Sequence, residues 1–271
     1  MRGKLELLSL LQLLEDEIMA LTHGSQACGG GYNLLRTKLD ELCEFMVRDE
    51  TIRQWKVWGR DKEIQNQAER LREASVEALC NVEKYVSQSI SLEEWGASPY
   101  LNHLFHSVKG EWQSFGMDGR SKLLFIGAGA LPISVLTFAK EFGSTALGID
   151  IDPATVGLAN RAAKAYGLET LVRFSDEKLS GLAFRREATH IMIASLVKNK
   201  HEVLKQLKET TRDDVEIMVR FGNGVKSIFN YPFESGLTRD WLTVQIIESN
   251  PIYDTVILHK SASQVGKAVL A

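Results

Sequence analysis

The sequence has no long apolar run, few cysteines and no large excess of charge of either sign. Its 271 residues carry 32 basic and 35 acidic side chains, for a net charge of −3, so there is no electrostatic footprint for nucleic acid. No stretch approaches the roughly 18 apolar residues that a membrane span requires, and the mean hydropathy is −0.12. An apolar fraction of 44% excludes a disordered chain. We therefore expect a folded protein that engages neither nucleic acid nor a membrane.

The cysteines and the first residues indicate a cellular compartment. Cys28, Cys43 and Cys80 form no CxxC pair, and their odd number predicts reduced thiols that fill small spaces in a core. The first 21 residues have early basic side chains, but acids interrupt their leucines. This pattern predicts an amphipathic helix and not a secretory signal. We expect a cytoplasmic protein.

The hydrophobic period divides the chain into two parts. In residues 1–118, apolar positions such as Leu7, Leu11, Leu14 and Ile18 recur at helical spacing, which predicts a bundle of five or six helices. In residues 119–271, short apolar runs alternate with helical patterns, which predicts an α/β, Rossmann-like parallel sheet with helices on both faces. The predicted strands are 122–126, 145–150, 171–175, 190–195 and 216–221; the predicted helices cover 131–142, begin at 152, and cover 199–210. Two last strands, 242–247 and 255–259, predict the reversed edge hairpin of a methyltransferase-type sheet.

A glycine loop follows the first predicted strand. Gly127 and Gly129 permit a tight turn and let backbone N–H groups approach a ligand. A dinucleotide fingerprint requires a third small residue where Pro132 stands, so the loop suits a nucleoside without a pyrophosphate. Asp150 ends the next strand, about 20 residues further on, where an acid can accept both ribose hydroxyls. Together these features predict S-adenosylmethionine (SAM) binding, whereas the alternative is an ordinary turn followed by a helix-capping Asp. The candidate contacts are Gly127, Ala128, Gly129, Ala130, Leu131, Pro132, Asp150 and Ile151.

Other polar residues follow the later strands. Asp152, followed by Pro153, is interpreted as a helix N-cap. Asp176 lies where such folds place an acid or amide near the adenine amino group. Ser195 and Leu196 follow the fourth strand, where an open sheet presents its carboxyl ends to a ligand.

Two segments carry a family resemblance. Residues 124–134, LFIGAGALPIS, resemble the SAM loop of nicotianamine synthases, and residues 220–232, RFGNGVKSIFNYP, resemble the nicotianamine synthase-like enzymes of bacterial opine metallophore pathways such as staphylopine and pseudopaline. The resemblance covers roughly residues 40–260. It implies attack by the α-amine of histidine on the methionine Cγ of SAM, so that the 2-aminobutanoyl group moves and methylthioadenosine leaves. It also implies no metal in the enzyme, and a downstream opine dehydrogenase that acts on the product.

Three other functions fit the same features. A nicotianamine synthase proper would condense SAM-derived units, and a SAM-dependent methyltransferase would act on a small molecule and release S-adenosylhomocysteine. A non-catalytic SAM-fold protein would bind SAM without consuming it. A homodimer through the N-terminal helices is plausible in each case.

The resemblance also implies roles for single residues. Glu83 lies in the segment that resembles the family's active-site glutamate region, where it would take the amine proton; its alternative is a solvated helix Glu paired to a basic neighbour. Tyr100 resembles the tyrosine of the family's FPYY segment, although Leu101 replaces the second aromatic residue of plant enzymes. Tyr231 would lie near the methionine end of SAM. Arg220 would either hold a carboxylate bidentately or form a surface salt bridge.

Histidines and tryptophans of the first part have simpler interpretations. His103 and His106 have a spacing also used for metals, but no third ligand accompanies them, so we interpret them as helix-surface or pocket-lining residues. Core or inter-domain packing is favoured over a base-stacking platform for Trp55, Trp58, Trp95 and Trp112.

Overall fold

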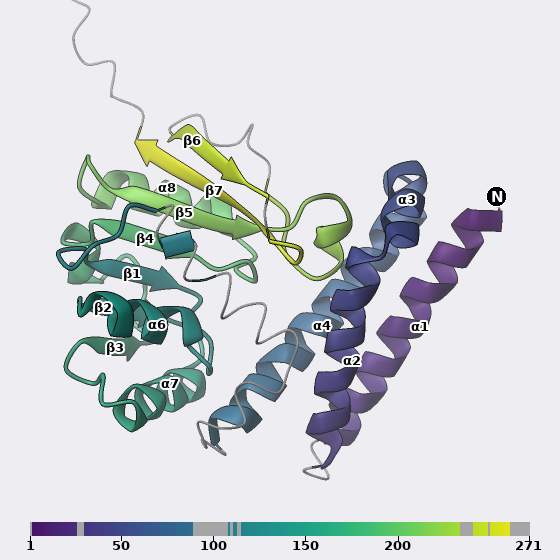
Figure 1. The fold of residues 1–271 in the computed structure, drawn as a ribbon, viewed down its shortest axis with the longest axis horizontal. Helices are drawn as coiled ribbons and strands as arrows, with labels where there is room; N and C mark the ends of the chain where they lie inside the picture. Colours follow the sequence, from purple (N-terminus) through teal and green to yellow (C-terminus); the bar gives the residue numbers. More distant parts are fainter. Residues whose placement is uncertain are drawn as a thin grey trace, which may run out of the picture.

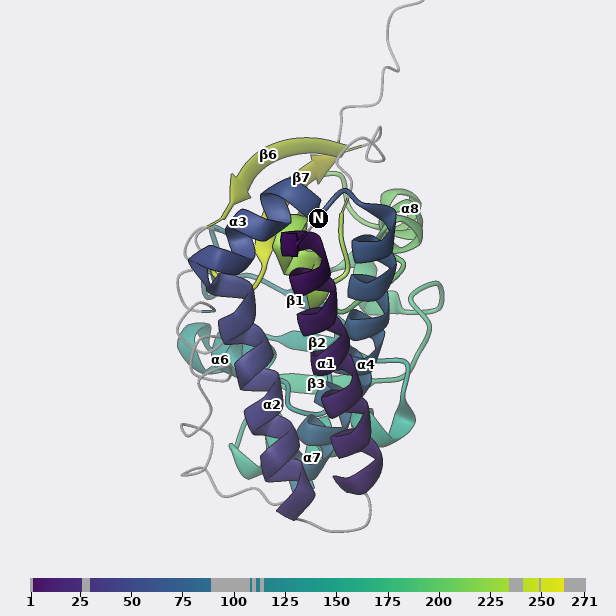
Figure 2. The same ribbon diagram turned by 90° about the vertical axis from the view of Figure 1, so that its right-hand side faces the viewer.

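The computed structural model describes residues 2–25, 30–88, 108, 111–112, 115–233, 241–248 and 250–260. Within these ranges the first part of the chain forms four long helices, and the second forms a seven-stranded sheet flanked by helices. Figure 1 shows the sheet and the N-terminal helices as two adjacent bodies, and in Figure 2 α1 and α2 lie in front of the sheet. Among the described residues, no helix is both long and apolar enough to cross a bilayer.

The N-terminal helices pack around an apolar core. They are α1 (Arg2–Ser25), α2 (Gly30–Val47), α3 (Asp49–Trp58) and α4 (Lys62–Gln88). Leu7, Leu11 and Ile18 are buried in this core, as their spacing predicts. The predicted break at 96–99 lies outside the described residues, and of residues 89–114 only 108 and 111–112 are described, all three of them helical.

The sheet has the predicted order of parallel strands closed by an antiparallel hairpin. Its strand order is β3-β2-β1-β4-β5-β7-β6, and β7 pairs antiparallel with both β5 and β6. The strands are β1 (Leu123–Ile126), β2 (Ala146–Ile149), β3 (Val172–Ser175), β4 (His190–Ile193), β5 (Glu216–Phe221), β6 (Trp241–Ile247) and β7 (Asp254–Lys260). This arrangement confirms the Rossmann-like fold with a reversed edge.

Helices cover both faces of the sheet, as a parallel sheet requires. The apolar cluster on one face contains residues of α6 (Ile133–Phe142) and α7 (Pro153–Ala165), and the cluster on the other face contains Leu204 and Leu207 of α8 (Lys200–Thr210). Two short 3₁₀ turns complete the described elements: η2 (Ala183–Arg186) lies between β3 and β4, and η3 (Gly224–Ile228) follows β5. The predicted N-cap of α7 is confirmed, because Asp152 accepts a hydrogen bond of 2.9 Å from the Ala154 N–H.

The core of the N-terminal helices is shared with the second part of the chain. The apolar cluster of the N-terminal helices also contains Ile228, Phe229, Ile252 and Tyr253 from the second part. Helix α4 is in contact with both η3 and α7, so it lies against the end of the sheet domain where the parallel strands terminate. The side chains of α4 therefore reach the loops that follow the strands.

The cysteine and tryptophan side chains differ in how deeply they are buried. Cys43 is buried in the helical core, but Cys80 is exposed, so the core-filling interpretation is wrong for Cys80. Trp112 is buried and packs edge-on against Phe138. Trp55 and Trp58 pack against the helical core, which confirms the packing interpretation for these three. Cys28 and Trp95 lie outside the described residues.

Candidate active site

The glycine loop (residues 127–132) connects β1 to α6 and has the backbone that its sequence predicts. Gly127 has φ +81° and Gly129 has φ +71°, a region in which only glycine is unstrained. The N–H groups of Gly127 and Ala128 donate to the Ile149 carbonyl at 2.9 and 3.0 Å. A Cβ at Gly127 would stand 2.6 Å from Val197 Cγ2. Both glycines are therefore required by conformation and by close approach.

Asp150 holds the loop from the end of β2. Its Oδ2 accepts the Gly129 N–H at 2.9 Å, and its Oδ1 accepts the Asp152 N–H at 3.2 Å. The N-cap of α7 is Asp152, so the helix-capping alternative for Asp150 is wrong. Asp150 is half-buried, and it brings a carboxylate to the glycine loop at the carboxyl edge of the sheet.

Glu83 extends from α4 onto the same loop. A Cβ at Gly129 would stand 2.6 Å from Glu83 Oε2, so the carboxyl group is in contact with the loop backbone. Burial, and next the negative charge of Asp150, raise the pKa of Glu83 to about 8, while the hydrogen bond from the Ala130 N–H opposes the shift. Two carboxyl groups thus share one loop, and the Glu83 proton is held near neutral pH.

The alternative interpretation of Glu83 as a solvated, ion-paired helix residue is wrong. Glu83 is half-buried, and its basic neighbour Lys84 pairs with Asp152 at 2.5 Å. One turn further along α4, the Ser87 hydroxyl donates to the Ala130 carbonyl at 2.5 Å. These contacts attach α4 to the glycine loop on either side of Glu83.

Tyr231 connects α4 to the loops after β4 and β5. Its hydroxyl donates to Glu73 Oε2 at 2.8 Å, and its N–H donates to the Ser195 carbonyl at 3.2 Å. Three cationic groups, from Arg72, Lys198 and Lys200, lie 5.2–5.6 Å from its ring centroid. The structure therefore brings Tyr231 and Ser195 together, and it orients the Tyr231 hydroxyl toward α4.

Arg220 lies inside the protein, at the end of β5. It is 3% exposed; its Nε donates to Glu111 Oε2 at 3.1 Å and its Nη1 donates to the Ser134 hydroxyl at 3.0 Å. Glu111 also accepts a hydrogen bond from the Thr255 hydroxyl. The predicted alternative of a surface salt bridge is therefore wrong, because the Arg220 charge is buried and paired with Glu111 inside the protein. Arg220 instead joins β5 and β7 to the first turn of α6.

The remaining candidates are spread along the carboxyl edge of the sheet. Asp176 is exposed after β3, and Ile151 is 98% exposed. Ser195 and Leu196 are half-buried, and Leu196 packs against the core of the N-terminal helices. Buried positions of the glycine loop are Ala128, Ala130, Leu131 and Pro132. Tyr100, His103 and His106 lie outside the described residues.

Sequence reasoning missed three residues of this region. Glu111 and Glu73 stand in no recognisable motif, and only the fold shows their partners Arg220 and Tyr231. Lys200 is buried although it is a lysine, and the available signal was its place in the first turn of the predicted helix 199–210, where a cation is disfavoured.

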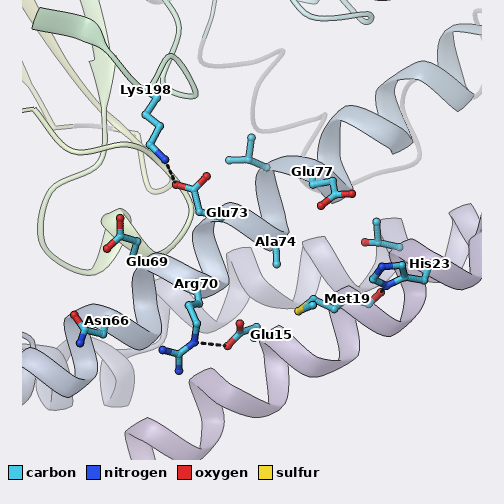
Figure 3. A pocket seen from close by; sticks show the side chains of 12 residues that line it. Glu15, Met19, His23, Asn66, Glu69, Arg70, Glu73, Ala74, Glu77 and Lys198 are labelled. Atoms are coloured by element: carbon cyan, nitrogen blue, oxygen red, sulfur yellow. Dashed lines mark hydrogen bonds and ion pairs between the residues drawn. The ribbon is translucent and has the colours of Figure 1, made fainter.

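A groove lies beside this site, between α1 and α4 (Figure 3). Glu15, Glu69, Glu73 and Glu77 line it together with Arg70 and Lys198. Lys198 Nζ is 2.8 Å from Glu73, and Arg70 Nε is 3.5 Å from Glu15. Within the described ranges, no three His, Cys, Asp or Glu side chains are grouped so that they could hold a metal ion.

Comparison with known proteins identifies relatives over nearly the whole chain. Residues 38–265 match the family described as "Nicotianamine synthase protein". A protein of Pseudomonas aeruginosa (strain UCBPP-PA14) named "L-histidine 2-aminobutanoyltransferase" is 40% identical over 96% of this chain and 99% of its own. A protein of the same name from Yersinia pestis is 30% identical over 94% of this chain and 96% of its own.

Solved structures agree with the fold. The crystal structure of MtNAS in complex with MTA and tNA has a TM-score of 0.77 at 16% identity and covers 94% of this chain and 98% of that one. A glutamate-to-glutamine mutant of MtNAS in complex with S-adenosylmethionine has a TM-score of 0.72 at 17% identity, over 92% of this chain and 98% of that one. At these identities the likeness concerns the fold, including the N-terminal helices.

Proposed function

Because the chain belongs to the nicotianamine synthase family, we propose that it transfers the 2-aminobutanoyl group of SAM to the α-amine of L-histidine. The amine nitrogen forms a bond to the methionine Cγ, the Cγ–S bond breaks, and methylthioadenosine leaves with the electron pair on sulfur. The amine loses one proton, for which Glu83 is the proposed acceptor. The observation that carries this proposal is the contact of Glu83 from α4 with the glycine loop at Gly129.

The proton balance explains why a carboxyl group is needed there. A free amino-acid amine is mostly protonated near neutral pH and is not nucleophilic in that form. A group with a pKa near the working pH is the most effective general base, and such help typically contributes about 10²–10⁴-fold. Glu83, with its pKa raised to about 8, meets this requirement. A bound cation would favour its ionised form.

The residues of the glycine loop fit a nucleoside with a positively charged sulfur. The loop has two glycines with positive φ and lacks the third small residue of a pyrophosphate-binding fingerprint, because Pro132 stands at that position. Asp150 supplies negative charge beside it, and Glu83 adds to this charge when a bound cation favours its ionised form. We propose that Asp150 binds the ribose and that Asp176 lies toward the adenine. The wall of the proposed SAM site would be formed by Ser195, Leu196 and Tyr231. The sulfonium supplies a leaving group that is already activated, so the proposed reaction requires no enzyme-bound metal.

The role proposed for Arg220 follows from its partners. Its contacts with Glu111 and Ser134 support a role in holding the first turn of α6 after the glycine loop. Tyr100 stays a proposed substrate contact on the family resemblance alone. A downstream opine dehydrogenase that consumes the product is proposed on the same ground, whereas a cytoplasmic location is proposed from the cysteine pattern and the amphipathic first segment.

Product analysis tests the reaction. The protein is incubated with SAM and with L- or D-histidine, and the products are identified by mass spectrometry. We expect methylthioadenosine and a histidine adduct that carries one aminobutanoyl unit, with L-histidine as the acceptor. S-adenosylhomocysteine would indicate a methyltransferase, and condensed SAM units without histidine would indicate a nicotianamine synthase proper.

A single substitution tests the proton acceptor. Glu83→Gln keeps the size of the side chain but cannot take the proton, so we expect turnover to fall by about 10²-fold or more while calorimetry still detects SAM binding. Glu77→Gln, on an exposed position of the same helix, is the matched control and keeps full turnover. Unchanged turnover in Glu83→Gln would remove Glu83 from the mechanism.

A further inference from the structure

Lys200 is a buried cation for which the proposed chemistry has no use. It is 1% exposed and occupies the first position of α8. At this end of a helix the unpaired N–H groups carry partial positive charge, so a lysine there is electrostatically unfavourable. Burial, followed by the charge of Arg72, lowers the pKa of Lys200 to about 7. The position therefore costs stability, and a compensating role must lie in its contacts.

Besides its position 5.6 Å from the Tyr231 ring centroid, Lys200 has hydrogen bonds to three backbone carbonyls of two separate loops. Lys200 Nζ donates to the Ser195 and Val197 carbonyls at 2.7 Å each, and to the Tyr231 carbonyl at 3.4 Å. The first two belong to the loop after β4, and the third belongs to the segment after β5. The Tyr231 N–H donates to the Ser195 carbonyl, so the ammonium group lies where the two loops meet.

One of these loops touches the glycine loop directly. Val197 Cγ2 lies so close to Gly127 that a Cβ there would be only 2.6 Å away. The carbonyl of the same residue is bound by Lys200. A displacement of Val197 would therefore remove the wall against which the glycine loop is packed.

We propose that Lys200 is a positioning residue for the nucleoside site: its ammonium group fixes the loop after β4, so that Val197 supports Gly127 and Ser195 stays beside Tyr231. This inference rests on the proposed use of SAM. It assigns no contact with the substrate to Lys200, which acts through Val197 and Tyr231. This role predicts that loss of the Lys200 ammonium group weakens nucleoside binding more than it changes kcat or the KM for histidine.

The test is Lys200→Met, which keeps the length of the side chain and removes the donors. We expect the Kd for SAM and for methylthioadenosine, measured by calorimetry, to rise by about tenfold or more. At saturating SAM, kcat and the KM for histidine should stay within about threefold of wild type. Lys205→Met, on the exposed side of α8, is the control and leaves all these values unchanged.

A second variant keeps the proposal testable if Lys200→Met fails to fold. Val197→Ala removes the contact with Gly127 but keeps the carbonyl bound by Lys200, and it should also weaken SAM and methylthioadenosine binding with kcat preserved. Unchanged nucleoside affinity in folded Lys200→Met, or in Val197→Ala, would overturn the positioning role. If the wild-type protein itself does not bind SAM, the proposed function fails, and that result is distinct from a failure of Lys200 alone.

Discussion

At the scale of single residues, Glu83 occupies a place where a carboxyl group is unfavourable in the ligand-free protein. It is in contact with the backbone at Gly129 and near the charge of Asp150. Such a placement destabilises the ionised form in the absence of ligand. A cationic ligand would relieve the repulsion. Stability and activity therefore place opposite demands on this residue.

The first prediction concerns the pH dependence of stability. The pKa of Glu83 is raised from 4.5 to about 8 on folding, so between these values the folded state binds more protons than the unfolded state. Stability therefore falls as pH rises through this window. Glu83→Gln cannot ionise, and at pH 8 we expect it to be more stable than wild type by on the order of 2 kcal/mol, because partial exposure to water reduces the full effect.

Urea unfolding of the ligand-free proteins at pH 5, 6.5 and 8 measures this difference. The two proteins should converge near pH 5, where wild-type Glu83 is protonated when folded. Glu77→Gln controls for the change of one surface charge. A gap that is constant across the three pH values would show that Glu83 is not the titrating group.

At the scale of elements, α4 is the helix that joins the two parts of the protein. It binds the glycine loop through Ser87 and the start of α7 through Lys84. Toward its other end, Arg72 Nη1 donates to the Ser227 carbonyl at 2.6 Å and Glu73 accepts from Tyr231. These contacts determine both the rotation and the position of the helix. Glu83 reaches Gly129 because these contacts fix both the rotation and the position of α4.

The second prediction tests this close approach. In Gly129→Ala the new Cβ would meet the Glu83 carboxyl group at 2.6 Å in a backbone with φ +71°, so the carboxyl group must move away from the loop and the backbone is strained. We expect SAM affinity to fall at least tenfold and stability to fall by about 1–3 kcal/mol. Calorimetry and thermal unfolding measure the two effects.

Gly167→Ala is the matched control for backbone strain. Gly167 has φ +66°, but its Cβ would meet nothing within 4 Å. This variant should lose only about 1 kcal/mol of stability and keep its SAM affinity. If both variants lost affinity equally, a general loosening of the fold would explain the result, and the contact between Glu83 and Gly129 would not.

At the scale of the whole molecule, the core of the N-terminal helices crosses the predicted boundary between domains 1–118 and 119–271. Ile228, Phe229, Ile252 and Tyr253 from the second part are buried in the cluster formed by the N-terminal helices. Unfolding the helices alone would expose these side chains to water, at a cost of roughly 1.5–3 kcal/mol for each fully buried one. A homodimer through the N-terminal helices stays a prediction.

The third prediction is that the protein unfolds in one cooperative step. The far-UV signal of the helices and the near-UV signal of Tyr253 and the other aromatic residues should give the same midpoint in thermal unfolding. The calorimetric and van't Hoff enthalpies should agree. Two separated transitions, with the helices melting first, would contradict the shared core.

Features that depend only on neighbouring residues could be predicted from the sequence. The apolar spacing of α1, the β–α alternation, the glycines of the loop and the N-cap Asp152 are local properties, because they follow from backbone geometry and periodicity. The family resemblance singled out Glu83 as the candidate proton acceptor, whereas periodicity alone does not distinguish it from any other helix glutamate.

Which distant side chains meet depends on how the helices and strands pack, and the sequence did not predict it. Arg220 and Glu111 are 109 residues apart and Tyr231 and Glu73 are 158 apart, and no local pattern records such pairs. The burial of Lys200 and of Arg220 was also decided there, because the exposure of a charged side chain depends on which elements pack over it. The sequence could place a carboxyl group on a helix, but the packing of α4 against the sheet placed it at Gly129.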